Sequence, residues 1–170
     1  MPLHEISSRN TALTGSWRSL IVFLLLCYGV ATIGGLVTDS SLGTWYRDLA
    51  KPSFNPPDWL FGPVWTVLYA LIAVAGWSIW RLRPHPAVRA ALWVFALQLL
   101  LNLSWTAFFF GLRSPALALM AISLLMVVIA ANIVLFWRLD QSAAWLLVPY
   151  LFWVGFATAL NAAIWSLNSS

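Results

Sequence analysis

Five long stretches of this sequence are almost free of charged residues, and no other feature constrains the fold as strongly. A helix rises about 1.5 Å per residue, so roughly 20 apolar residues cross the ~30 Å hydrocarbon core of a bilayer. The stretches that reach this length are 17–37, 59–80, 90–110, 115–137 and 143–167. Backbone groups in lipid must be hydrogen-bonded within their own segment, and no alternating pattern indicates a barrel. The sequence therefore predicts an all-α integral membrane bundle of five transmembrane helices.

Composition excludes the soluble classes of protein. Of the 170 residues, 62% are hydrophobic and 8% are charged, whereas soluble domains contain about 45–50% apolar and about 25% charged residues. A soluble enzyme, a coiled coil, a disordered tail and a nucleic-acid-binding module are therefore excluded, and the lipid bilayer is the expected partner. We expect one domain, residues 1–170, and the net charge of +4 is typical of loops that face a membrane surface.

The basic residues are divided unequally between the two sides of the predicted bundle. Six lie on the side of the N-terminus and three on the opposite side: Arg9, Arg18, Arg81, Arg83, Arg89 and Arg138 against Arg47, Lys51 and Arg113. Because positively charged loops stay on the cytoplasmic side of an inner membrane, this division predicts a cytoplasmic N-terminus. An outer-membrane location is the alternative, and the rule does not apply there.

The connection between the first two predicted helices, residues 38–58, is the only long one. Loops of this length in a compact domain are usually functional or disordered. Large apolar and aromatic residues argue against disorder here: Trp45, Tyr46, Leu49 and Phe54. A helical turn over 44–50 would hold the Trp and Tyr rings at headgroup depth, and the prolines that follow would stiffen the return. We interpret the segment as a lid over one mouth of the bundle, with a plain interfacial anchor as the alternative.

Polar and aromatic residues deep inside the spans are the candidate site residues, because each polar group in lipid costs free energy unless it meets a partner or a ligand. Gln98 and Asn102 lie four residues apart on one face of the third helix, and Trp105 follows on nearly the same stripe. Trp65 and Trp153 also lie deep within their spans. Several indole rings around a cavity would suit a planar, largely apolar ligand. Interhelical hydrogen bonding and helix packing are the competing explanations.

The predicted spans contain no residue suited to metal or charge-transfer chemistry. None of them holds Asp, Glu, Lys or His, so a charge-coupled pump lacks its parts. His4 and His85 lie outside the spans and Cys27 is the single cysteine, so we expect no metal site, no haem held by paired histidines and no internal disulfide. Catalytic triads and paired carboxylates are missing as well, and no obligatory cofactor is expected.

Three long motifs point to one family. The strings WYRDLAKPSFNPPDWLFGPVWTVLY (45–69), LQLLLNLSWTAFFFG (97–111) and AAWLLVPYLFWVGFATALNAAIWSLN (143–168) closely resemble the tryptophan-rich sensory protein / translocator protein family (TspO/MBR, the peripheral benzodiazepine receptor family). The resemblance runs from about residue 20 to residue 168 and indicates the bacterial type, so a bacterial envelope is the expected location. It implies a five-helix bundle, often a homodimer, with a pocket under the first loop. There the family binds porphyrins such as protoporphyrin IX and isoquinoline- or benzodiazepine-type drugs.

Residue roles follow from the resemblance only at matching positions. Trp45 and Trp153 correspond to tryptophans linked in the family to porphyrin binding and light-dependent degradation, and they are the candidates for any catalytic role. Trp65 and Asn102 match residues that hydrogen-bond pocket ligands, and Ala157 matches a small residue thought to set the shape of the pocket. From helix-face geometry we add three further ligand-binding candidates: Tyr69, Gln98 and Trp105.

On this basis we expect a porphyrin-binding membrane sensor whose ligand buries its face against Trp45, Trp65 and Trp153. The propionates of the ligand would meet Arg47 and Lys51 of the lid. Light-dependent degradation of the porphyrin is one alternative. A porphyrin transporter is a second, although the chain shows one lid and no inverted repeat. Regulation of a partner protein is a third.

Two further features bear on partners. Small residues at helical spacing, Ala31-xxx-Gly35 and Gly155-xxx-Ala159-xxx-Ala163, allow helices to approach closely, within the bundle or at a homodimer seam. Animal relatives carry a cholesterol motif near the C-terminus that needs a Tyr followed by Lys or Arg. Here residues 160–170 contain neither, which argues against high-affinity cholesterol binding.

Overall fold

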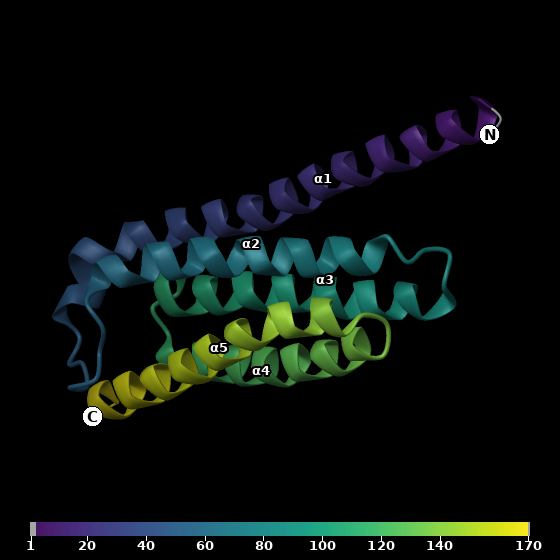
Figure 1. Ribbon diagram of the computed structural model, residues 1–170. Coiled ribbons are helices and arrows are strands. Elements are labelled where there is room, and N and C mark those ends of the chain that lie inside the picture. Colours follow the sequence, from purple (N-terminus) through teal and green to yellow (C-terminus); the bar gives the residue numbers. More distant parts are fainter. Residues whose placement is uncertain (1–2, 170) are drawn as a thin grey trace.

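The computed structural model describes residues 3–169 and shows a bundle of five long helices, α1 to α5 (Figure 1). Their bounds are Leu3–Ser41, Phe61–Trp80, Pro86–Thr106, Pro115–Trp137 and Gln141–Asn168. All five are long and apolar enough to cross a membrane, and no strand occurs within the described range. The predicted all-α membrane bundle is confirmed. Residues 1, 2 and 170 of the expected domain lie outside the described residues, as do the side chains of His4 and Arg9.

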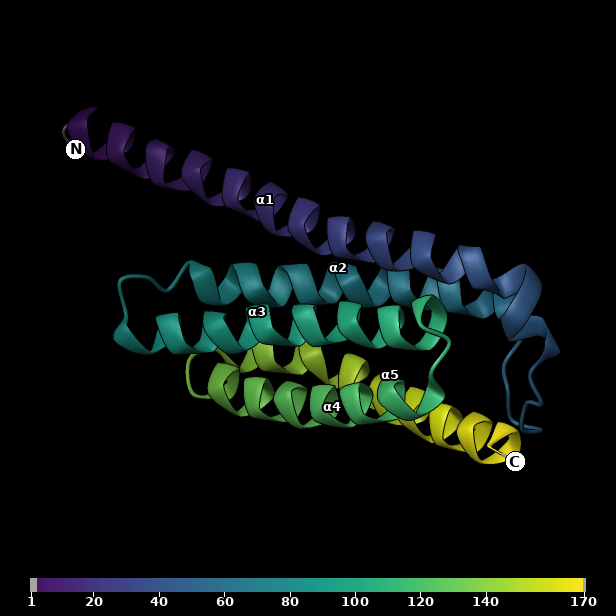
Figure 2. The same ribbon diagram turned by 180° about the vertical axis from the view of Figure 1, so that it is seen from behind.

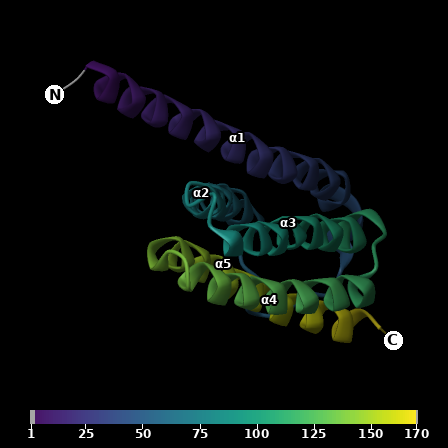
Figure 3. The same ribbon diagram turned by 90° about the vertical axis from the view of Figure 1, so that its right-hand side faces the viewer.

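The helices pack in a closed order, with α1 against α2 and α3, α2 against α5, and α4 against α3 and α5. Neighbours in sequence run antiparallel, so the two chain ends lie at opposite ends of the bundle (Figure 2). We call the end that holds the α1–α2 loop and the C-terminus of α5 the lid end, and the other end the distal end. Toward its N-terminus α1 diverges from the remaining helices and projects beyond them at the distal end (Figure 3).

Hydroxyl groups extend α1 beyond the expected end at residue 37. Thr38 donates a hydrogen bond from Oγ1 to the carbonyl oxygen of Gly34 at 2.9 Å, and Ser41 donates from Oγ to that of Phe110 at 2.7 Å. These bonds let a polar run remain helical, and a π-helical turn, Leu42–Tyr46, follows without a break. The lid, which we define as residues 47–57, is therefore shorter than the expected 38–58, and residues 49–57 of it are irregular.

The other helix ends have recognisable causes. Asp140 caps α5 by accepting hydrogen bonds at Oδ1 from the backbone N–H groups of Ser142 and Ala143, at 2.8 and 3.3 Å. Pro115 and Pro86 occupy the first positions of α4 and α3, where a missing N–H has no consequence. The α4 helix spans the residues expected from the sequence, and α3 continues into a second π-helical turn, Ala107–Gly111.

In the distal half of the core, aromatic rings pack closely around α2. Phe95 stacks on Phe136 with ring centroids 6.3 Å apart, and Phe23 meets Phe95 at 5.9 Å. Gly76 of α2 lies under these rings. A Cβ atom there would stand 2.6 Å from Cζ of Phe95 and 2.9 Å from Cε1 of Phe23, so only glycine fits without displacing them.

Candidate ligand-binding cavity

The lid half of the bundle encloses a cavity of about 500 Å³ between α1, α2, α3 and α5. This volume lies within the roughly 300–1,000 Å³ that is typical of small-molecule sites. The cavity begins beneath the π-helical turn Leu42–Tyr46 and reaches inward as far as Tyr69 and Asn102. Its walls come from α1 and the π-helical turn that follows it, from α2, from the end of α3 with its own π-helical turn, and from the C-terminal half of α5.

Aromatic residues from α2 and α3 form its principal wall. Phe61, Trp65 and Tyr69 lie four residues apart on α2, so they project from one face of the helix, and all three line the cavity. Trp65 lies 5.7 Å from Tyr69 and 6.2 Å from Trp105 of α3, with interplanar angles of 37° and 34°. These inclined rings give the cavity a flat, polarisable side.

A polar relay closes the inner end of the cavity. Tyr69 donates a hydrogen bond from its hydroxyl to Oδ1 of Asn102 at 2.7 Å, and Asn102 donates from Nδ2 to the hydroxyl of Tyr150 at 2.9 Å. Asn102 is buried, and its side-chain amide forms hydrogen bonds with these two tyrosine hydroxyls. The carbonyl oxygen of its side chain has a second lone pair with which a ligand donor could still interact.

Asn161 is a cavity residue to which the sequence analysis gave no role. It lines the cavity from α5 and accepts a hydrogen bond at Oδ1 from the indole N–H of Trp105, at 3.2 Å. Its own Nδ2 donates to the carbonyl oxygen of Pro115 at 2.8 Å. The available signal was its spacing, because Asn161 lies four residues beyond Ala157, which also lines the cavity. Asn161 therefore fixes the plane of Trp105.

Five of the eight expected ligand-binding residues line the cavity: Trp65, Tyr69, Asn102, Trp105 and Ala157. Trp45 and Trp153 lie one side chain behind the wall. Trp45 packs on Phe109, at 5.6 Å between ring centroids, and Trp153 packs on Phe61 at 5.9 Å. Both of these phenylalanines do line the cavity.

Gln98, the remaining expected residue, is not among the residues that line the cavity. It is fully buried one turn before Asn102, and neither atom of its amide has a hydrogen-bond partner among the described residues.

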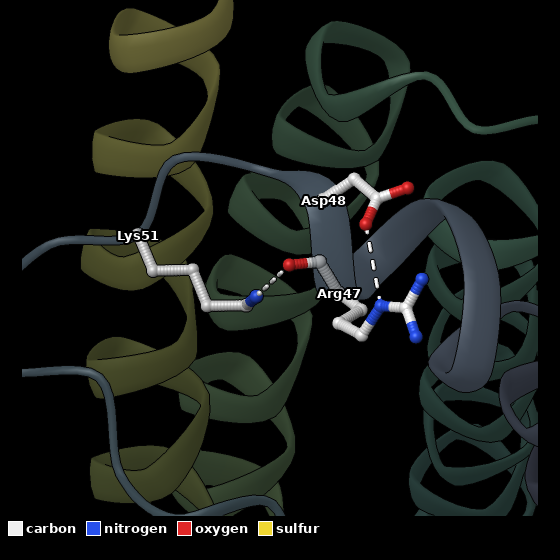
Figure 4. Close-up of polar contacts among 3 residues, drawn as sticks. All are labelled: Arg47, Asp48 and Lys51. Carbon is white, nitrogen blue, oxygen red and sulfur yellow. Dashed lines mark hydrogen bonds and ion pairs between the residues drawn. The ribbon is translucent and has the colours of Figure 1, made fainter.

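Neither of the two basic residues of the lid lines the cavity. Arg47 donates from Nε to Oδ1 of Asp48 at 3.3 Å, and both side chains are more than two-thirds exposed (Figure 4). Lys51 donates from Nζ to the backbone oxygen of Arg47 at 3.2 Å and lies 4.6 Å from the ring centroid of Tyr46. The expected pairing of these cations with ligand carboxylates stays a prediction, because neither side chain is among the cavity-lining residues.

Two polar contacts that the sequence did not indicate fasten the lid. Tyr46 is buried beneath it and donates from its hydroxyl to Oδ1 of Asn55 at 3.2 Å. Burial and the nearby Asp58 carboxylate raise the pKa of Tyr46 to about 12, against the opposing effect of the hydrogen bond to Asn55. At the end of α5, Asn168 accepts from the N–H of Ala50 at 3.0 Å and donates to its carbonyl oxygen at 2.9 Å. The lid is thus held both by the buried Tyr46 and by the C-terminal end of α5.

These features define a class: an integral membrane protein of five helices with an aromatic cavity under a lid. The chain belongs to the TspO/MBR family, whose family model matches residues 23–166. The Tryptophan-rich protein TspO of Chlorobaculum tepidum is 41% identical to it over 157 residues, covering 88% of this chain and 96% of that one. The Tryptophan-rich sensory protein of Cereibacter sphaeroides is 38% identical, covering 89% and 92%. The human Translocator protein is 37% identical, covering 73% and 75%. The expected family membership is confirmed.

Proposed function

We propose that this protein is a membrane sensor that binds a flat aromatic ligand of the tetrapyrrole type, such as protoporphyrin IX, in the cavity beneath the lid. The observation that carries the proposal is the wall formed by Trp65, Tyr69 and Trp105 beside a space of about 500 Å³. Inclined aromatic faces attract a planar ring system through dispersion and offset stacking. The Cereibacter sphaeroides relative is named a sensory protein, which supports the sensing role.

Filling the cavity tests the binding proposal directly. Ala157 is buried and lines the cavity, whereas Ala159 is exposed on the same helix. We expect Ala157→Phe to weaken binding of protoporphyrin IX at least tenfold, because the new ring occupies the ligand's space, and Ala159→Phe to leave it unchanged. Quenching of intrinsic tryptophan fluorescence during a titration in detergent measures both. Equal affinities in the two variants would contradict the proposal, as would an affinity of Ala157→Phe equal to that of the unmodified protein.

A second candidate function is light-dependent degradation of the bound ligand. Trp45 and Trp153 each pack on a phenylalanine that lines the cavity, and under this proposal their indoles exchange electrons with the excited macrocycle. Under this proposal Trp45→Phe together with Trp153→Phe abolishes the light-dependent loss of the porphyrin absorption band while binding in the dark persists. Loss at an equal rate in this variant, or in denatured protein, would count against it.

From the division of basic residues we propose that the distal end of the bundle lies in the cytoplasm. The lid end, where the cavity opens, then lies outside the cytoplasm. At the distal end Arg81 lies 4.7 Å from the ring centroid of Trp77, and Arg83 lies 3.0 Å from that of Trp80, which is typical of a basic, interfacial surface. With Cys27 replaced by Ala, we expect a cysteine at Ser53 of the lid to react with an impermeant thiol reagent in intact cells. A cysteine at Ser142 of the distal end should react only after lysis. The reverse pattern would reject this orientation.

A further inference from the structure

The mouth of the cavity carries two carboxylates that the proposed function does not use. Asp39 comes from the last turn of α1 and Asp58 from the start of the 3-10 turn Asp58–Leu60 that leads into α2. Both line the cavity and both are exposed. Neither forms an ion pair with any described residue. Two segments that are separated by the whole lid therefore bring like charges to one opening.

No basic side chain balances this pair from within the cavity. Among the described residues that line it, none is Lys, Arg or His. Arg47 is paired with Asp48 on the outer surface, and Lys51 lies against Tyr46 and the backbone of Arg47. The two aspartates are therefore the only formal charges among the described residues that line the cavity. Burial and, after it, the Asp58 carboxylate raise the pKa of Tyr46, so this carboxylate acts on a residue of the cavity wall.

The wall itself favours the same sign of ligand charge. The faces of aromatic rings carry partial negative charge and attract cations within about 6 Å. Trp59 and Tyr46 line the cavity together with the two aspartates. A cationic group at the opening is attracted by both carboxylates and by the ring face of Trp59, whereas an anionic group is repelled by both carboxylates. One side of the Tyr46 ring is already occupied by Nζ of Lys51, 4.6 Å from the ring centroid.

We propose that the mouth selects by charge, and that the cavity takes a flat aromatic ligand whose polar end is a protonated amine in preference to one that ends in free carboxylates. This inference rests on the proposed binding function and specifies the chemistry of its ligand. Asp39 and Asp58 are its specificity-determining residues. It also means that the propionates of protoporphyrin IX weaken binding to this protein.

The test compares three derivatives of one macrocycle: protoporphyrin IX, its dimethyl ester, and its bis-amide with N,N-dimethylethylenediamine, which carries two protonated amines at neutral pH. Dissociation constants are measured in detergent at low salt for the unmodified protein and for the double variant Asp39→Asn, Asp58→Asn. Asp48→Asn is the matched control, because it removes a carboxylate that lies on the lid but not on the cavity.

We expect the double variant to bind the diamine roughly tenfold more weakly and the diacid severalfold more tightly, the size that two exposed charge interactions can reach. The ester should bind equally to all three proteins, which also shows that the variants are folded. Raising the salt concentration should shrink the difference in the unmodified protein, because exposed charges are screened.

The possible failures are distinguishable. If no macrocycle binds the unmodified protein, the proposed function and this inference fall together. If all three bind but the double variant leaves the ratio of diamine to diacid affinity unchanged, the inference alone is overturned and the binding function stands. A change of equal size in Asp48→Asn would overturn it as well, because the effect would then come from net charge and not from the mouth.

Discussion

The lid half and the distal half of this bundle are built from the same helices, but the lid half contains a cavity and the distal half is closely packed. In the lid half α2 presents Phe61, Trp65 and Tyr69 toward an open space of about 500 Å³. In the distal half the same helix presents Ala73 and Gly76 to neighbours that leave no room. Large rings at every fourth position hold helices apart, and small residues let them close. The position of the cavity thus follows from where side-chain size changes along α2.

Overpacking the distal half should have the largest effect on stability. In Gly76→Ala the new methyl group meets Phe95 and Phe23, and Phe95 cannot move away because it is stacked on Phe136. We expect a loss of about 2 kcal/mol, reduced by the higher helix propensity of alanine. The matched change Gly35→Ala has no atom within 4 Å of its Cβ and should be neutral or stabilising. Thermal unfolding in detergent, followed by circular dichroism, measures both, and equal midpoints would erase the contrast between the halves.

The same substitution at two buried asparagines separates a satisfied amide from an unsatisfied one. Asn102→Leu leaves the hydroxyls of Tyr69 and Tyr150 without partners, which we expect to cost about 1–2 kcal/mol. Asn132 is fully buried and its amide has no hydrogen-bond partner among the described residues. Asn132→Leu should therefore leave stability unchanged or raise it. The ranking of the two unfolding midpoints is the measurement, and the opposite ranking would refute this account of the core.

Releasing the lid should have a smaller effect on stability and a clear one on kinetics. Asn168→Ala removes both hydrogen bonds to Ala50, which we expect to cost about 1 kcal/mol. Stopped-flow fluorescence should show faster ligand association and dissociation at nearly unchanged affinity, because the lid opens more often. Ser169→Ala, at the neighbouring exposed residue, serves as the control. Unchanged rates in Asn168→Ala would show that the lid does not limit entry.

The smallest effect concerns Tyr46. Its pKa is raised to about 12 in the fold, compared with about 10 in an unfolded chain. The folded state therefore holds this proton more tightly, so the stabilisation is complete below pH 10 and is lost as the pH rises toward 12. By pH 10.5 we expect a loss of less than about 1 kcal/mol. The difference in unfolding midpoint between the unmodified protein and Tyr46→Phe, followed from pH 8 to 10.5, isolates it. A difference that does not change with pH would contradict it.

Much of the fold was readable because lipid imposes a simple rule on the chain. A span needs about twenty apolar residues, so all five helices could be located and α4 matched its expected bounds. The end of α1 could not, because its extension depends on hydroxyl groups such as that of Ser41, which bonds to Phe110 far along the sequence. Hydropathy contains no information about such partners.

Cavity residues could be predicted from the sequence where helical spacing alone decides which face of a helix a residue occupies. Tyr69 and Trp105 line the cavity because each lies on the same stripe as another wall residue. Whether Trp45 or Trp153 lines the wall or stands behind it depends on how Phe109 and Phe61 turn, which no single-helix pattern specifies. The aspartates of the mouth escaped notice for a related reason. Asp39 lies just after the first expected span and Asp58 just before the second, and only the path of the lid brings them to one cavity.

The pair of hydrogen bonds between Asn168 and Ala50 has a practical consequence for the design of tagged protein. An affinity tag or fluorescent protein fused directly after Asn168 would lie next to the lid and could disrupt the two hydrogen bonds between Asn168 and Ala50. The N-terminal end of α1 lies at the far side of the molecule (Figure 1), so the same attachment there leaves the entrance undisturbed. Disagreement between preparations tagged at opposite ends would then be a property of the tag and not of the binding chemistry.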